Sequence, residues 1–337
     1  SNGADIQLNN STTDGPGTLN IDPGGTLSLF DSTVGNDLVS QGTVLAEYNS
    51  SGGVSVASQT SSISGIFTNQ DGGLLRLTAS NSYFSNGHTD VTLILGQGVI
   101  NHGDISLNQG GTRIGNTTLR ATSGEIFNSP TGTITTNQDS GQLSVRLLDG
   151  QVHNEGTIEI NAPTTIGGED AQHVNSGSIL IGGSLLVEQS GTDAKLTNSG
   201  ELFISGGRSV TVSGGAFEQT ANGTTSVFID GEISGNLDVT SSASLSGNIA
   251  FELSEGFEPS VGESFEIATF GSRSGEFALA DPSLPNGLVF NQVYTPTSLS
   301  LTAALPLRSS GVVQPSTGEI TTVTEAEVFG LLNEAIS

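Results

Sequence analysis

The chain has 337 residues, of which 47 are glycine and only 34% are hydrophobic, so many short strands suit it better than one large globular core. Eight basic residues against 34 acidic ones give a formal net charge of −26, which argues against nucleic acid and anionic lipid headgroups as partners. Cysteine is absent and no apolar run approaches the roughly 20 residues that span a bilayer, so we expect no disulfides and no membrane insertion.

Short alternating segments open the chain, at residues 17–21, 25–29 and 42–45. They follow the pattern of a half-buried strand but are spaced less regularly than the segments after them. We interpret residues 1 to about 30 either as a capping coil or as the place where further coils were removed, because the first coil of a stack exposes an open strand edge.

A repeated phrase dominates the centre of the chain: an apolar residue, Asn, one or two small or polar residues, Gly, and then an alternating strand. Copies begin at Asn101, Asn154, Asn175 and Asn198, and looser copies contain Asn69, Asn128 and, after Phe217, Asn222-Gly223. From Asn101 onward they lie about 21 to 27 residues apart, which is the length of one solenoid coil.

The phrase has a physical explanation, because Asn and Gly tolerate the backbone angles of a sharp corner. In the strand that follows, Ile158 and Ile160 would face a core while Glu159 faces solvent. A second short strand is expected in many coils, at residues 91–95, 143–145, 185–187 and 210–212. Two or three strands per coil predict an all-β chain, a right-handed parallel β-helix with a flattened or triangular cross-section.

Asn residues at equivalent corners could stack into an internal ladder of side-chain amide hydrogen bonds, which would satisfy buried turn backbone. The alternative is that Asn recurs only because it favours turns.

From about Gly235 the phrase stops and longer strands are expected, at residues 245–253, 263–270, 287–294 and 298–302. The segments 247–253, 259–267, 274–277 and 284–288, with Tyr294 and Leu299-Ser300-Leu301, resemble the end-of-solenoid module of bacterial autotransporter-like and filamentous-haemagglutinin-like surface proteins. The resemblance implies a C-terminal β cap on a secreted protein, located extracellularly or at a bacterial cell surface.

The last residues predict a short amphipathic helix, because Thr324 and Glu327 form a capping box and an apolar stripe follows. This stripe contains Val328, Leu331, Leu332 and Ala335. It would dock either on the end of the rod or on another subunit or domain. The predicted division is therefore coils at 1–234, cap at 235–304, linker at 305–323 and helix at 324–337.

Enzymes that cleave polysaccharides share this type of fold, and their catalytic residues follow known patterns. Ca²⁺-dependent lyases need clustered carboxylates with a basic residue, and hydrolases need paired acids. Lys195 is the only lysine, and the arginines are scattered, at 76, 113, 120, 146, 208, 273 and 308. We therefore predict no catalytic residues and no enzyme activity.

No cofactor or metal site is predicted either. Glu169-Asp170 and Asp139 could bind calcium weakly, but such residues are usually solvated turn acids. The histidines are His88, His102, His153 and His173. His102 and His153 lie beside repeat Asn residues two coil rises of about 4.8 Å apart, too far to share one ion at about 2.1 Å per bond.

The sequence is compatible with three functions. The first is a non-catalytic adhesin-type rod that binds a host or cell-surface glycan or protein through corners and loops. The second is a filament subunit that binds copies of itself end to end through the solenoid edges and the C-terminal tail. The third and least favoured is a polysaccharide lyase or hydrolase.

Overall fold

The computed structural model describes residues 3–47, 58–80, 90–110, 115–138, 144–231 and 233–306. These residues form strands, turns and loops, and none of them lies in a helix, so none forms a helix that could cross a membrane. One compact unit spans Ser1–Ala304 and a second spans Leu305–Ser337. The predicted helix at 324–337 and nearly all of the predicted linker at 305–323 lie outside the described residues.

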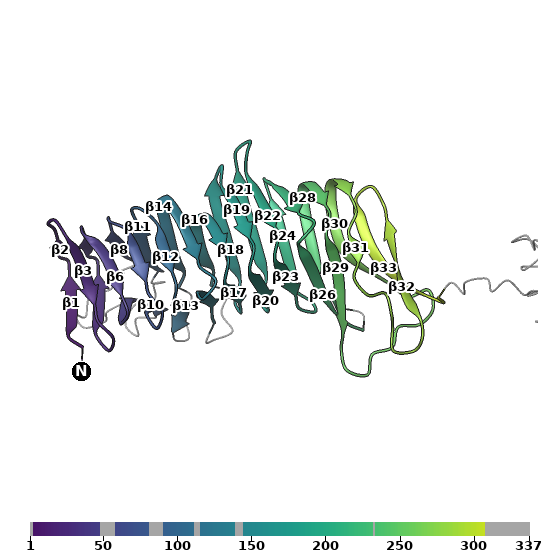
Figure 1. Cartoon of the computed structure of the whole chain (residues 1–337), viewed down its shortest axis with the longest axis horizontal. Helices are drawn as coiled ribbons and strands as arrows, with labels where there is room; N and C mark the ends of the chain where they lie inside the picture. Colours follow the sequence, from purple (N-terminus) through teal and green to yellow (C-terminus); the bar gives the residue numbers. More distant parts are fainter. Residues whose placement is uncertain are drawn as a thin grey trace, which may run out of the picture. The chain divides into compact units, whose positions relative to one another are not determined.

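One sheet, here called sheet A, takes one strand from each successive coil, and its strands follow one another along the unit in sequence order (Figure 1). All pairings along this path are parallel, and the short strand β27 (Ile233–Ser234) pairs antiparallel with the edge of β26. The strands in order are β1 (Asp5–Asn9), β4 (Thr26–Phe30), β7 (Thr43–Glu47), β10 (Leu74–Ser80), β13 (Asp104–Gly110), β15 (Thr133–Thr136), β17 (Thr157–Ile160), β20 (Ser178–Ile181), β23 (Glu201–Ile204), β26 (Thr224–Asp230), β29 (Asn248–Leu253) and β31 (Ala278–Leu279).

The other two strands of each coil belong to a second sheet, sheet B. On one face lie β2 (Thr12–Thr13), β5 (Thr33–Val34), β8 (Ser58–Ile63), β11 (Asp90–Leu95), β18 (Thr164–Glu169), β21 (Leu185–Ser190) and β24 (Ser209–Ser213). On the other lie β3 (Thr18–Ile21), β6 (Asp37–Ser40), β9 (Phe67–Asn69), β12 (Val99–Asn101), β19 (Gln172–Asn175), β22 (Lys195–Asn198) and β25 (Ala216–Gln219). The long strands β14 (Thr117–Asn128), β16 (Arg146–Asn154) and β28 (Asn236–Leu245) pair with both faces and so join them into one sheet. The all-β, parallel part of the predicted fold is thus confirmed.

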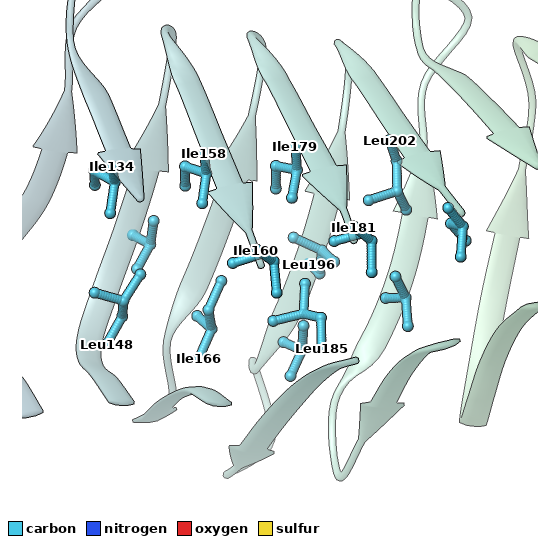
Figure 2. Packing of buried hydrophobic residues seen from close by; sticks show 14 of the residues in the cluster. Ile134, Leu148, Ile158, Ile160, Ile166, Ile179, Ile181, Leu185, Leu196 and Leu202 are labelled. Atoms are coloured by element: carbon cyan, nitrogen blue, oxygen red, sulfur yellow. The ribbon is translucent and has the colours of Figure 1, made fainter. Parts of the chain in front are cut away.

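The core forms from like residues stacked in register. Ile134, Ile158 and Ile179 are paired in neighbouring coils, and all are buried (Figure 2). Glu159 faces out between buried Ile158 and Ile160, as the alternation predicted. Because each coil buries only one side of its strands, its apolar area leaves water mainly by stacking on its neighbours.

The C-terminal end is closed by antiparallel strands. Parallel pairing continues past Gly235 through β30 (Ser264–Gly275), and then β33 (Ser298–Ala304) pairs antiparallel with both β30 and β32 (Val289–Tyr294). The Phe290 ring meets the edges of Phe251 and Phe265 at centroid distances of 4.8 and 5.9 Å. These aromatic rings bury the apolar end of the stack.

Two predicted strands were wrong in detail. The segment 245–253 is not continuous, because Ser246 and Gly247 form a turn, with φ of +65° at Gly247, between β28 and β29. The segment 143–145 is not a strand in its described part, since β16 begins at Arg146 and Val145 is 40% exposed. The strands predicted at 91–95, 185–187 and 210–212 are confirmed within β11, β21 and β24.

Candidate functional site

A continuous ladder of side-chain amides runs along the inside of the coils. The Nδ2 atom of each Asn donates to Oδ1 of the Asn in the next coil, at 2.7 to 2.8 Å from Asn69 to Asn198. The members are Asn69, Asn101, Asn128, Asn154, Asn175, Asn198 and finally Gln219, and none is more than 1% exposed. From Asn101 onward they are 21 to 27 residues apart, so the predicted ladder and its spacing are confirmed.

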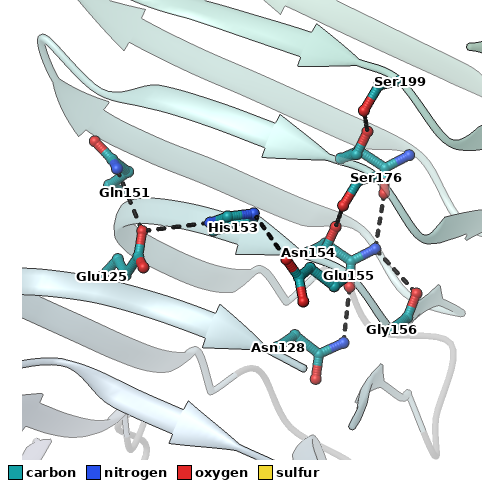
Figure 3. A network of polar contacts seen from close by, with 10 residues as sticks. Glu125, Asn128, Gln151, His153, Asn154, Glu155, Gly156, Ser176 and Ser199 are labelled. Carbon is teal, nitrogen blue, oxygen red and sulfur yellow. Dashed lines mark hydrogen bonds and ion pairs between the residues drawn. The ribbon is translucent and has the colours of Figure 1, made fainter. Parts of the chain in front are cut away.

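Each ladder amide also satisfies the backbone of the corner beside it. Asn154 Nδ2 donates to the carbonyl oxygen of Gly156 at 3.2 Å (Figure 3). It also donates to the carbonyl oxygen of Ser178 at 3.1 Å. Outside the ladder, the Ser176 hydroxyl donates to the carbonyl oxygen of Asn154 at 3.2 Å. The corner backbone is therefore buried without losing its hydrogen bonds.

The two ends of the ladder differ. Gln219 accepts a hydrogen bond of 2.6 Å from the Thr225 hydroxyl and donates to the carbonyl oxygens of Gly223, Ser246 and Asn248. At the other end, Oδ1 of Asn69 has no hydrogen-bond partner within the described residues, and neither has the buried hydroxyl of Ser40, its register neighbour. The copy predicted after Phe217 does lead into a strand, β26, but Asn222 is exposed and Gln219 takes the ladder position, so the equivalence of Asn222 with the other repeat Asn residues was wrong.

A second feature lies on the outer face of sheet A, across strands β17 to β29. Two adjoining shallow hollows of about 520 and 440 Å³ share Phe203, Ser205 and Glu252 in their walls. We call them together the sheet A hollow. Its apolar floor consists of Leu180, Phe203, Phe228 and Ile233, and its rim carries Glu159, Glu201, Asp230 and Glu252.

The carboxylates of this rim form no ion pair among the described residues. Three outward acids in other coils do pair with a cation one coil away. Glu47 pairs with Arg76 at 2.9 Å, Glu218 with Lys195 at 3.0 Å, and Asp149 with Arg120. The hollow is therefore a locally uncompensated negative site around an apolar floor.

The histidines considered as metal ligands lie apart. His102 follows ladder residue Asn101 and contacts the Ser129 hydroxyl at 2.9 Å, whereas His153 precedes ladder residue Asn154. His153 lies between Glu125 and Glu155, at 3.8 and 3.7 Å (Figure 3). Its ring also packs edge-on against Phe127. His88 lies outside the described residues.

His173 points into the core and is 1% exposed. Its Nδ1 atom accepts a hydrogen bond of 3.1 Å from the backbone N–H of Val152, while Nε2 has no partner within the described part of the chain. Burial lowers the pKa of His173 from 6.5 to about 4, because the charged ring would lose its hydration.

Glu169 and Asp170, the two candidate calcium residues that the structure describes, are adjacent in sequence and have no further carboxylate placed to complete a metal site in the described ranges. Glu169 ends β18 on the exposed surface, and Asp170 follows it with φ of +50°. Across the described ranges, no group of three His, Asp or Glu residues is placed to hold a metal ion. Asp139 lies outside these ranges.

The basic residues occupy varied positions. Arg273 lies over the Tyr294 ring at 4.3 Å, and Arg146 is fully buried and donates from Nε and Nη2 to the carbonyl oxygen of Asn137, at 3.0 and 2.8 Å. Arg113 and Arg308 lie outside the described residues. Sequence reasoning assigned no role to Arg146. The available signal was its position two residues before Leu148 in an alternating strand, because such residues face the same side, here the core.

Sequence reasoning also missed the sheet A hollow. The available signal was the apolar type of outward positions such as Leu180, Phe203 and Phe228, which alternate with core residues along their strands. No protein-family model matches the chain, and a search of curated proteins finds no match.

Proposed function

We propose that this chain is a right-handed parallel β-helix of the autotransporter-like or filamentous-haemagglutinin-like kind, which serves as a non-catalytic, adhesin-type rod at or released from a bacterial cell surface. The observation that carries the proposal is the unbroken amide ladder from Asn69 to Gln219, which holds successive coils in one register. Right-handedness is favoured because crossovers between parallel strands are right-handed in nearly all proteins.

The architecture is better suited to binding ligands on an exposed surface than to enclosing them in a pocket. Strands of sheet A turn one side to the core and the other to solvent, so ligands would meet an open face of the rod. The net charge of −26 keeps such a surface soluble and selects partners by charge.

Two measurements test this proposal. Antibodies against the chain should label intact cells of the encoding organism, and the fluorescently labelled chain should bind host cells or surface glycans and proteins saturably. Confinement of the chain to the cell interior would contradict the location, and absence of saturable binding would contradict the adhesin role.

A polysaccharide-cleaving activity is tested separately. Incubation with acidic polysaccharides and Ca²⁺ should give neither new reducing ends nor unsaturated products. Either product would overturn the non-catalytic part of the proposal.

A self-assembling filament is the second candidate, and β1 favours it. Within the described part of sheet A, β1 has β4 as its only strand neighbour, and Ile6 is 36% exposed. Edges of this kind can pair with another chain. At the opposite end, antiparallel β33 and β32 follow β30, so a partner would meet a different edge there. Negative-stain microscopy distinguishes the two: uniform fibres support the filament, and isolated short rods at high concentration contradict it.

A further inference from the structure

We propose that the sheet A hollow binds a cationic polypeptide segment with apolar side chains at its centre. This inference rests on the proposed function, because it names the chemical class of a partner for the same rod.

The floor of the hollow is the first part of the argument. Leu180 and Phe203 are register partners on β20 and β23, and both face outward. Between Leu45 and Glu159 the same outward row holds only polar residues, namely Arg76, Ser106 and Thr135. Single exposed apolar residues are common on protein surfaces, but here neighbouring coils place several together, which is typical of an interaction site.

Phe228 and Ile233 extend the floor into the next coil. Phe228 lies on β26, and Ile233 on β27 is 54% exposed and pairs with Asp230. Glycines keep this part of the surface open: a Cβ atom added at Gly206 would lie 3.1 Å from the Phe228 ring. The apolar centre of a bound segment can therefore lie directly over these side chains.

The rim surrounds the floor with carboxylates. Glu159 is the register partner of Leu180 at one end, and Glu252 is the register partner of Phe228 at the other. Glu201 and Asp230 lie at the sides, each two residues from a floor phenylalanine on the same strand. A segment with cations at both ends and apolar residues between them matches this arrangement.

Charge decides which occupant fits. Among the residues that the structure describes, no Lys or Arg lines either hollow. Arg208, the nearest cation in sequence, is exposed after the turn at Gly207. A second copy of a chain with net charge −26 would be repelled. The predicted C-terminal helix carries Glu325, Glu327 and Glu334 and no basic residue, so it is repelled as well.

The test uses the full chain and a capped synthetic peptide with lysines flanking a central leucine pair. Fluorescence anisotropy at physiological salt should show saturable binding. A peptide with serine in place of leucine should bind at least about tenfold more weakly, because it lacks apolar contacts, and a peptide with glutamate in place of lysine should not bind.

Two sets of variants locate the site. The triple change Glu159→Gln, Glu201→Gln, Glu252→Gln should weaken binding about tenfold or more, and so should Phe203→Ser with Ile233→Ser. The matched control is Glu169→Gln, Glu188→Gln, Glu266→Gln, which removes three exposed carboxylates from sheet B and should change affinity by less than about twofold. Circular dichroism and thermal unfolding check that each variant folds.

Three results would overturn the inference: equal loss in the matched control, equal binding of the serine peptide, or binding of neutral glycans that depends on Phe203 while the lysine-leucine peptide fails to bind. If the peptide does not bind although the labelled chain adheres to cells, the inference is wrong and the proposed function stands. If the peptide binds at the hollow but the chain is neither exported nor adhesive, the proposed function is wrong instead.

Discussion

Asn128 donates from Nδ2 to Oδ1 of Asn154 at 2.7 Å, so two residues 26 positions apart in sequence share one buried hydrogen bond. Asn154 repeats the bond with Asn175 at the same distance. From Asn101 to Gln219 each ladder amide is both a donor and an acceptor, so its removal leaves buried partners on both sides unsatisfied.

Replacement of one ladder residue should therefore be costly. We expect Asn154→Ala to lower the free energy of unfolding by about 3 kcal/mol, because Asn128 loses its acceptor and the carbonyl oxygens of Gly156 and Ser178 lose a donor. Urea denaturation followed by circular dichroism measures the change. Asn161→Ala is the control, because Asn161 lies directly after β17 in the same coil, is exposed, and makes a bond of 3.4 Å to Asn137. This change should cost less than about 1 kcal/mol. Equal costs would contradict a stabilising role of the ladder.

His173 should make stability depend on pH in the acid range. Its pKa is about 4 in the folded chain, against 6.5 for a histidine in water, so the unfolded chain takes up a proton first as the pH falls. The contribution of neutral His173 is complete above pH 6.5 and is lost between pH 6.5 and about 4, with a total of about 3 kcal/mol. His173→Asn keeps an acceptor for the Val152 N–H but does not titrate. Between pH 7 and pH 4 the wild type should therefore lose about 3 kcal/mol more unfolding free energy than the variant does. A difference between the two that stays constant with pH would contradict the lowered pKa of His173.

Close approach of coil backbones requires glycine at the repeat corner. A Cβ atom at Gly177 would overlap the carbonyl oxygen of Gly156 in the preceding coil, and backbone cannot move aside without separating the coils. We expect Gly177→Ala to destabilise the chain by about 3 kcal/mol or to prevent folding. Gly167→Ala is the matched control, since the nearest atom to its added Cβ lies 3.4 Å away. Thermal unfolding measures the melting temperature of both variants. Similar decreases in melting temperature for Gly177→Ala and Gly167→Ala would contradict this explanation.

The aromatic end of the stack should be stabilised by Phe290. Its ring is 1% exposed and contacts Phe251 and Phe265 edge to face, so Phe290→Ala should cost about 3 to 5 kcal/mol and expose the β32–β33 region to proteases. Val293→Ala, on the same strand at 47% exposure, should cost less than about 0.5 kcal/mol. Guanidinium denaturation and limited proteolysis provide the two readouts. Unchanged protease resistance of Phe290→Ala would show that the aromatic contacts do not hold the end closed.

The coils and the ladder were predictable from sequence because both follow from local chemistry. Asn154 and Asn175 each precede a glycine corner and an alternating strand, and this recurrence establishes their equivalence before any contact is known. Gln219 escaped the pattern because the ladder requires a carboxamide rather than an Asn, and the longer side chain of Gln also reaches the position. The nearby Asn222-Gly223 pair matches the repeated sequence pattern, but it lies three residues after the ladder position.

The sheet A hollow could not be predicted from the sequence in this way. Leu180, Phe203 and Phe228 are 23 and 25 residues apart, and their adjacency depends on how many residues each corner takes up. A corner longer or shorter by one residue reverses which side chains face outward. The rim adds acids from four different strands, so the site exists only after the register of every coil between Glu159 and Glu252 is set.

The amide ladder also gives the stack of coils a net dipole along its length. Every Nδ2 from Asn69 to Asn198 points toward the following coil and every accepting oxygen toward the preceding one, so the side-chain dipoles add head to tail as peptide dipoles do in a helix. Insertion of one complete coil with its own Asn would lengthen this array without interrupting it, whereas insertion of part of a coil would leave two amides facing a gap. The unit in which such a protein can grow or shrink is therefore the whole turn, and length can change by duplication while polarity is inherited unchanged.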